Sequence, residues 1–526
     1  MKKLLVSIAL FIFALTSYSA SKDWINIIDY GADNSGEELC GKVINECIET
    51  AHNNGGGTVY IPAGEYLTGP IHLKSNVTLH LEAGALVKFS NDFDLYLPFV
   101  QQRWEGTVMK SFSPLIYAHG QENIAITGRG KFDGQGRGWW RWYYENKKDP
   151  NVVPRHKYFD MWEEQNGDVV TEDYYWVTMK WRFFRPSMVQ FFQCKNILID
   201  GLTFVNSPFW TINPAFSENI TIHNVTVFNP PSPNTDGINP TSCKNVRISN
   251  CHISVGDDCI TIKSGRDIDG RKWATPTENV TITNCTMLNG HGGVVIGSEV
   301  SGDIRKITIS NCVFDGTRRG IRLKSARGRG GIVEDIRVSN IVMKNIQDQA
   351  LVFNLFYDPS AKPEPISERT PVFRNIHISD LTAVDVKKAC TLYGIEEMPV
   401  QNISFNNINI QSQTGFEVNT GKNIEFHNVE VTTEKGPSFI IDNSSNLIIS
   451  NVKSRKPIDD VPVINLNNVE NTFITNNFPL EKTPLYINIE GEDSKDIFLQ
   501  NNNFYNVKEI VKRSKEVKSK NIKIKK

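Results

Sequence analysis

The sequence predicts an all-β fold, a single-stranded right-handed parallel β-helix in which short strands stack coil upon coil. One observation behind this prediction is a repeat of about 25 residues, whose copies mostly start with Asn and continue with alternating β-branched residues. Clear examples are Asn219-Ile-Thr-Ile-His-Asn-Val and Asn245-Val-Arg-Ile-Ser-Asn-Cys. The other is that helical spacing of apolar residues is almost absent from the repeats. Several short strands per repeat are typical of a β-solenoid.

The repeat runs through most of the chain and predicts one solenoid domain over residues 20–526. Its copies begin at 196, 219, 245, 279, 306, 335, 375, 402, 423 and 446, more weakly at 471, 496 and 521, and earlier at 76 and 123. Leucine-rich repeats have a similar period, but their Leu-x-x-Leu-x-Leu signature is absent, and a β-propeller needs about 40 residues per blade.

The first 19 residues predict a secretory signal peptide. Lys2 and Lys3 precede an apolar run over 4–15, and Ser17 and Ser19 place the cut after Ser19. A membrane anchor is the alternative, but this run is too short to span a bilayer, so we expect no stable membrane insertion. The mature protein is predicted to be exported, either to a periplasm or to the medium. A formal net charge of -1 gives no sign of a nucleic-acid partner.

The next stretch predicts a cap for the end of the solenoid. Alternation over 25–30 predicts a strand, and apolar residues at helical spacing over 37–53 predict a helix. Further strands are expected over 58–61, 71–73 and 77–81. A terminal repeat has to cover an exposed core face, and one helix before many strands suits that purpose.

Departures from the repeat predict loops on one side of the solenoid. The largest insertion spans about 136–186 and is rich in Trp and Tyr. Its aromatic residues either pack a small core of their own or stack on sugars, whose C–H faces suit aromatic rings, and both interpretations stay open. Shorter excursions lie at 265–278 and 353–370. Among the nine cysteines, Cys251, Cys285 and Cys312 hold the same place in three repeats, so we expect them to stack as buried thiols rather than to pair.

Short motifs between 234 and 324 carry the candidate chemistry. They supply three carboxylates, an imidazole, two cations and an amide: Asp236, Asp257, Asp258, His291, Arg322, Lys324 and Asn234. Residues one coil apart in a β-helix stack at about 4.8 Å, and the intervals between the motifs are close to one coil. We therefore expect these side chains in one outward-facing patch.

Within the patch, Asp236 and Asp257 are 21 residues apart and are expected side by side. Gly256 is expected to bend the chain so that Asp257 and Asp258 both face outward. Three carboxylates this close repel one another, which raises at least one pKa and gives a general acid beside a general base. With cations for a substrate carboxylate, this set suits an acid–base hydrolase acting on an acidic sugar. A calcium site is the competing use, but the adjacent cations disfavour it, so we expect no metal and no cofactor.

These motifs, in this order on a β-helix, resemble the polygalacturonase family, the family 28 glycoside hydrolases. The likeness extends from Asp29-Tyr30-Gly31-Ala32 past Asn402. It implies inverting hydrolysis of α-galacturonosyl linkages in pectin, on a pectic polysaccharide or oligogalacturonide substrate.

The resemblance also implies a role for each residue. Asp257 would be the general acid, Asp236 and Asp258 would activate the water, and His291 would support the acid. The substrate-binding residues would be Arg322, Lys324 and Asn234. Leu323 stands where the family often has Ile, and the family's later Tyr has only Tyr357 as a candidate.

Long loops can wall off one end of a groove, which favours exo-action. The alternatives are hydrolysis of rhamnogalacturonan or another substituted pectin, a β-elimination lyase, and a non-catalytic polysaccharide-binding β-helix. The lyase and the binding protein have no need of the three-carboxylate set. We expect a monomer.

Overall fold

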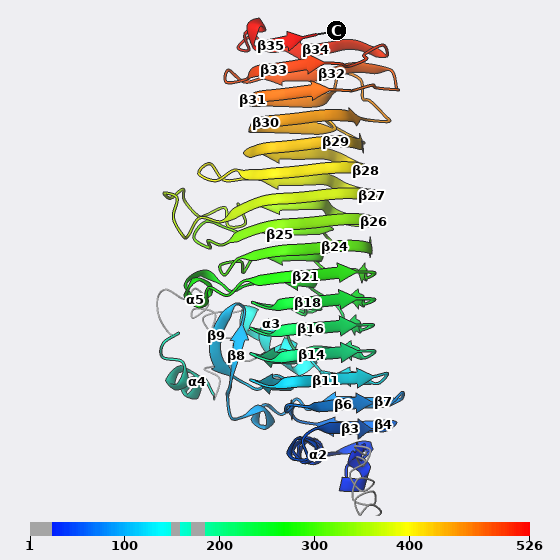
Figure 1. The fold of residues 1–526 in the computed structure, drawn as a ribbon, viewed down its shortest axis with the longest axis vertical. Helices are drawn as coiled ribbons and strands as arrows, with labels where there is room; N and C mark the ends of the chain where they lie inside the picture. The colour runs from blue at the N-terminus through cyan, green and yellow to red at the C-terminus, as the bar shows by residue number, and fades with distance from the viewer. Residues whose placement is uncertain (1–23, 149–157, 170–184, 526) are drawn as a thin grey trace, which may run out of the picture.

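The computed structural model describes residues 24–148, 158–169 and 185–525. They form a tall parallel β-helix, with the N-terminal cap at the base of Figure 1 and the C-terminal strands at its top. This confirms the predicted fold class. The signal peptide predicted for residues 1–19 lies outside the described residues and stays a prediction.

Three rows of parallel strands build the solenoid. The first row contains β1 (Ile25–Asn26), β3 (Gly57–Ile61), β6 (Val77–Leu81), β11 (Glu122–Gly128), β14 (Lys195–Asp200), β16 (Glu218–His223), β18 (Lys244–Ser249), β21 (Thr277–Thr283), β33 (Lys495–Gln500) and β35 (Ile522–Ile524). The second contains β2 (Ser35–Leu39), β4 (Gly64–Thr68), β7 (Ala85–Phe89), β12 (Lys131–Asp133), β15 (Thr203–Val205), β17 (Thr226–Phe228), β19 (His252–Ser254) and β22 (Thr286–Leu288).

The third row carries the candidate site. It contains β5 (Ile71–His72), β10 (Ile116–His119), β13 (Val189–Phe192), β20 (Asp258–Ile262), β23 (Gly292–Gly297), β25 (Ile321–Lys324), β32 (Thr483–Glu490) and β34 (Val507–Arg513). Longer strands run through more than one row: β24 (Ile304–Asp315), β26 (Ile332–Asn354), β27 (Val372–Tyr393), β28 (Val400–Asn419), β29 (Gly421–Thr433), β30 (Phe439–Lys453) and β31 (Pro462–Thr475).

The register confirms the predicted repeat. The residue after each predicted start, from 196 to 521, pairs with its counterpart one coil away: Ile197, Ile220, Val246, Val280, Ile307, Ile336, Ile376, Ile403, Ile424, Leu447, Thr472, Ile497 and Ile522. Nearly all of these side chains are buried, so they form an aliphatic stack along the axis.

The repeated Asn has a physical cause. Asn196, Asn219, Asn245 and Asn279 all have a φ between 55° and 59°, a left-handed conformation that Asn tolerates better than most residues. Their side chains also form a ladder, because each amide N–H donates to the Asn one coil before it, over 2.9–3.0 Å. A second ladder joins 375 to 471.

Replacing Asn245 with Ala is expected to lower the free energy of unfolding by about 2 kcal/mol, because the change strains the left-handed backbone and removes two ladder hydrogen bonds. Asn245→Gly keeps the backbone relaxed and loses only the ladder, so it should cost less. Denaturant titration of both variants measures the difference. Equal losses would contradict the backbone part of this explanation.

The N-terminal cap is partly as predicted. The predicted helix is α2 (Gly41–Asn53), but it begins after residue 37 because 35–39 forms β2, which pairs with β4. The strand predicted over 25–30 is wrong beyond Asn26. Residues Ile27–Tyr30 form a 3₁₀ helix, η1, because the Asn26 side chain accepts a hydrogen bond from the backbone N–H of Ile28.

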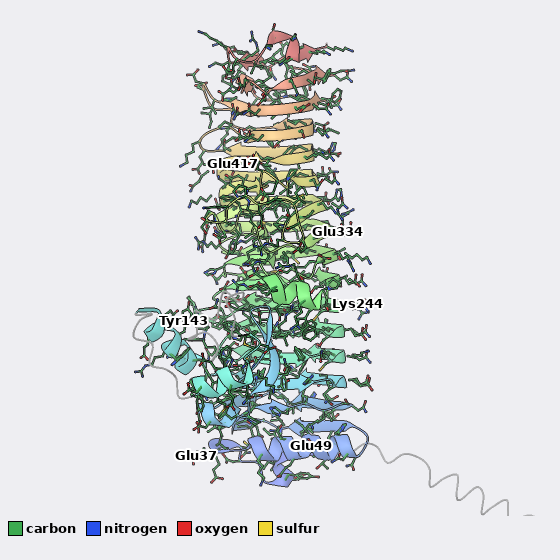
Figure 2. The ribbon with its side chains drawn as sticks, turned by 90° about the vertical axis from the view of Figure 1, so that its left-hand side faces the viewer. Glu37, Glu49, Tyr143, Lys244, Glu334 and Glu417 are labelled. Atoms are coloured by element: carbon green, nitrogen blue, oxygen red, sulfur yellow. The ribbon has the colours of Figure 1, made fainter. Side chains whose placement is uncertain are left out.

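The described part of the aromatic insertion packs against the solenoid. It forms α3 (Arg137–Lys148) and α4 (Phe159–Gln165). Trp139 stacks on Phe93 of η2 (Phe93–Tyr96), with ring centroids 3.8 Å apart, and Trp162 is also buried. Figure 2 shows Tyr143 of α3 on a part of the molecule that stands out from one side of the coils. These residues favour the packing interpretation, while Tyr174, Tyr175, Trp176 and Trp181 lie outside the described residues.

A hairpin and a helix lie over the ends of the third-row strands, the hairpin on the coils up to that of Ser242 and the helix on the coils that follow, where Arg271 donates to the carbonyl oxygens of Gly328 and Arg329. The hairpin consists of β8 (Val100–Trp104) and β9 (Thr107–Ser111), and the helix is α5 (Asp267–Trp273). Figure 1 shows the hairpin, α4 and α5 on the same side of the solenoid. The Arg103 guanidinium donates to the Ser242 hydroxyl at 2.6 Å, and the backbone N–H of Arg266 donates to the carbonyl of Gly106 at 3.1 Å. We call this cover the N-terminal wall.

All nine cysteines lie within the described ranges, and each is a buried, unpaired thiol, as predicted for Cys251, Cys285 and Cys312. At the C-terminal end, η4 (Ser519–Asn521) leads into β35. Within the described residues, no helix has the length and apolar character needed to span a bilayer.

Candidate active site

The third row brings the three predicted carboxylates together. One carboxylate oxygen from each of Asp236, Asp257 and Asp258 lies within 4.8 Å of the other two. The expected pairing is corrected in detail. Ile238 pairs with Ile260, so Asp236 lies level with Asp258 rather than with Asp257.

Gly256 is needed for a different reason from the one expected. Its backbone does not adopt a positive φ. A Cβ atom there would lie 2.5 Å from the backbone nitrogen and 2.6 Å from the carbonyl oxygen of Ser232. The missing side chain therefore lets two turns of neighbouring coils touch, and this contact places Asp257 just before β20.

Asp258 is buried and held by a cation. Lys324 Nζ donates to Asp258 Oδ2 over 2.8 Å. Burial alone would raise the pKa of Asp258, but the charges of Lys324, Arg322 and Lys263 and the Lys324 hydrogen bond outweigh it and hold this pKa below its ordinary value. Asp258 Oδ1 is buried with no hydrogen-bond partner among the described residues, and Gly292 leaves the space beside it free of a side chain. An ionised oxygen with a free lone pair can bind a water molecule.

Asp236 has the opposite protonation tendency. Its Oδ2 accepts hydrogen bonds from Asn239 Nδ2 at 3.0 Å and from the Thr261 hydroxyl at 3.4 Å. Burial, followed by the nearby charge of Asp257, raises the pKa of Asp236 well above its ordinary value, and Lys263 opposes this shift. The cluster thus contains one carboxyl that tends to keep a proton and one that stays ionised.

Asp257 and His291 form the exposed part of the cluster. His291 Nδ1 lies 3.1 Å from Asp257 Oδ1, and the ring N–H donates to the carboxylate. This hydrogen bond is the main cause of a raised pKa at His291. The side chain of His291 is 50% exposed and that of Asp257 is 20% exposed, whereas Asp236 and Asp258 are buried. Asp257 is therefore the carboxyl that a large substrate can reach.

The predicted substrate-binding residues lie close by, with one qualification. The Tyr357 ring is 42% exposed, and its centroid is 5.4 Å from Arg322 Cζ and 5.7 Å from Lys324 Nζ, so the structure joins this Tyr to the two cations. Arg322 Nε is buried without a hydrogen-bond partner in the described part of the chain. Asn234 is less free than expected, because its Oδ1 accepts from the buried Arg185 at 2.8 Å.

Sequence reasoning missed Lys263, whose Nζ lies 2.7 Å from Glu299 Oε2 and 4.6 Å from the centroid of the Trp210 ring. A signal was present: Gly297 pairs with Lys324, and Lys263, the residue after β20, lies one coil before Gly297 because Ile262 pairs with Ile296. Aligning the coils residue by residue would have placed Lys263 and Lys324 in one outward row.

The three carboxylates could also offer oxygens to a metal ion. The ammonium of Lys324 already bonds to one of them, and the charge of Lys263 acts on the other buried one. These contacts support the expectation of no metal, which stays a prediction.

Comparisons with known proteins show which family this chain resembles. The family profile described as "Glycosyl hydrolases family 28" matches residues 182–430, and one described as "Rhamnogalacturonase A/epimerase, pectate lyase-like" matches residues 24–92. A "Probable polygalacturonase" of Vitis vinifera is 31% identical over 396 residues, covering 73% of this chain and 74% of that protein. An "Endo-polygalacturonase" of Pectobacterium carotovorum is 26% identical over 72% of this chain and 84% of that one.

A solved structure is also similar, that of a hyperthermoactive exopolygalacturonase from Thermotoga maritima. It is 33% identical with a TM-score of 0.67, over 78% of this chain and 93% of that one. The family profile covers the coils that carry all the predicted site residues. This chain therefore belongs to glycosyl hydrolases family 28, the polygalacturonase family of pectin-degrading glycoside hydrolases.

Proposed function

We propose that this hydrolase is an exo-acting polygalacturonase that removes galacturonate from one end of a galacturonan chain with inversion at the anomeric carbon. The observation that carries the proposal is the carboxylate cluster, in which a reachable Asp257 stands beside a buried, ionised Asp258 with a free oxygen. In this proposal Asp257 protonates the glycosidic oxygen, and Asp236 and Asp258 activate the water.

The remaining residues hold the acid and the substrate. His291 hydrogen-bonds to Asp257 and keeps its carboxyl aligned. Arg322, whose guanidinium lies beside the Tyr357 ring, receives the substrate carboxylate, assisted by Lys324. Tyr357 presents its ring beside the same sugar. The amide N–H₂ of Asn234 is left to donate to a substrate hydroxyl, since its oxygen bonds to Arg185.

The N-terminal wall supports the exo mode. It covers the ends of the third-row segments on the coil of Asp236 and on the coil before it, where Arg103 donates to Ser242 and where the Arg103 guanidinium lies 4.4 Å from the Phe216 ring centroid. In the other direction the surface is hollowed. A space of 540 Å³ beside His291 reaches Gln347, and a second of 710 Å³ continues from there. A chain can therefore extend from the site toward the C-terminal coils but not beneath the wall. Relatives described as exo-acting and as endo-acting both occur.

The spacing of the carboxylates makes the stereochemistry worth measuring. Oxygens within 4.8 Å are closer than the roughly 6.5–9.5 Å that usually separates the two carboxyl groups of inverting enzymes. Inversion here requires the water to be held by Asp236 and Asp258 together, on the side of the sugar opposite Asp257. Proton NMR of the first product should show the β-anomer from an α-linkage. An initial α-anomer would overturn the inverting assignment.

The product series tests the exo mode. Incubation of the mature protein with homogalacturonan, followed by chromatography and ultraviolet absorbance, should give galacturonic acid as the only early product. A ladder of oligomers would show endo-action, and an ultraviolet-absorbing product would show a lyase. No product from homogalacturonan, with cleavage of rhamnogalacturonan or another substituted pectin, would favour the branched-substrate alternative.

A further inference from the structure

A buried ion pair lies on the same extended segment as a residue that contacts Asp236. The Thr261 hydroxyl donates to Asp236 Oδ2 at 3.4 Å, and Lys263 follows two residues later, on the same face of the segment. Lys263 is 3% exposed and Glu299 is 7% exposed, and their charged atoms are 2.7 Å apart. The same ammonium lies 4.6 Å from the centroid of the Trp210 ring and 3.5 Å from the carbonyl of Gly297. A Lys and a Glu this deeply buried are normally retained only when their charges are used or matched.

The charges around this pair are few and can be named. Asp236 is acted on by Asp257, Asp258, Lys263 and Lys324. Lys263 is acted on by Glu299, Asp236 and Asp258. Glu299 is acted on by Lys263, Arg266 and Arg329, and it acts in turn on the buried Arg103. Lys263 is thus the group shared between Glu299 and the catalytic cluster, because its ammonium interacts electrostatically with the carboxylates of both.

We propose that Lys263 and Glu299 are a positioning pair that decides which carboxyl of the cluster keeps the shared proton. Lys263 weakens the hold of Asp236 on the proton in favour of the acid, and Glu299 limits that effect by attracting the same ammonium. The inference rests on the proposed function, because it matters for turnover only if Asp236 acts as a base.

Two substitutions of the pair should move the acid limb of the kcat/KM profile in opposite directions. In Lys263→Met the cation that favours ionised Asp236 is lost, so Asp236 stays protonated to higher pH and the limb moves up by about one pH unit. In Glu299→Gln the ammonium has only the catalytic carboxylates to attract, so the limb moves down. The double variant should return close to wild type, since the shift belongs to the cluster as a coupled unit.

The controls separate this effect from structural damage. Lys263→Arg keeps the charge and should keep the limb near wild type. Asp269→Asn neutralises another buried acid, which lies in the N-terminal wall 3.7 Å from Arg103. Asp269 is not among the main charges acting on Asp236, so this variant should leave the acid limb in place. Should Lys263→Met not fold, Glu299→Gln and Lys263→Arg still decide the matter.

A second readout does not need turnover. Asp-selective ¹³C-carboxyl NMR, with the Asp236 resonance assigned from Asp236→Asn, should show the same opposite shifts in its titration. Shifts in the same direction, or no shift in Glu299→Gln, would overturn the inference. If wild type hydrolyses no galacturonan, the proposed function fails, and the NMR titration still tests the pair.

Discussion

Replacing Asp257 with Asn is expected to lower kcat on galacturonan by about 10³-fold, within the range that a positioned general acid supplies. The Asn oxygen can still accept hydrogen bonds from the backbone N–H of Asp258 and from His291, which now contact Asp257 Oδ1 at 2.9 Å and 3.1 Å. The fold should therefore be kept while the transferable proton is lost. A reducing-end assay measures the rate, and circular dichroism checks the fold.

The leaving group offers a sharper test of this assignment. An aryl galacturonide with an activated leaving group needs little protonation, so Asp257→Asn should slow its hydrolysis far less than that of galacturonan. Equal slowing of both substrates would mean that Asp257 serves another purpose. Asp269→Asn is the matched control, because it makes the same chemical change at a buried site away from the cluster.

Replacing Lys324 with Met is expected to lower kcat/KM by about 10²-fold near neutral pH, because one partner of a buried charge pair is left alone. Lys324 is among the groups that hold the pKa of Asp258 down against burial. Without it, burial prevails, the pKa of Asp258 rises, and the carboxylate is protonated at a pH where it is now ionised. Activity should fall most at low pH and recover in part as pH rises.

The conservative change separates charge from shape at this position. Lys324→Arg keeps a cation that can reach Asp258, so its acid limb should stay closer to wild type than that of Lys324→Met. A pH–rate series of both variants makes the comparison. If the two profiles have the same midpoint and differ only in height, the Lys324 charge does not set the ionisation of Asp258.

The solenoid and most of the site could be predicted because equivalent positions of successive repeats, far apart in the sequence, lie side by side in the fold. Once Asn219 and Asn245 are known to start successive coils, the lateral neighbours of the strand residues that follow are known as well, up to the next turn of unequal length. This is why Asp236, Asp257, Asp258, His291 and Arg322 could be placed in one patch. Asp236 was expected one residue away from its true partner. The cause is that the turn between the second and third rows is of different length on the coil of Asp236 and on the coil of β20.

The wall could not be predicted in the same way. Arg266 meets Gly106, and Arg103 meets Asp269, across more than 150 residues and outside any repeat. No periodicity links such positions, so the contacts of the hairpin β8–β9 could not be predicted from the sequence. Gly256 shows the same limit, since its role depends on how closely the turn at Ser232 approaches.

The unequal spacing of the coils has a consequence for how such an enzyme can diversify. The starts at 402 and 423 are 21 residues apart and those at 335 and 375 are 40 apart, yet Ile403 pairs with Ile424 and Ile336 with Ile376. Extra residues are absorbed at the periphery, and the interior is unaffected by them. Loops that decide which polymer is recognised can thus be lengthened or exchanged one at a time during evolution, without repacking the aliphatic stack along the axis.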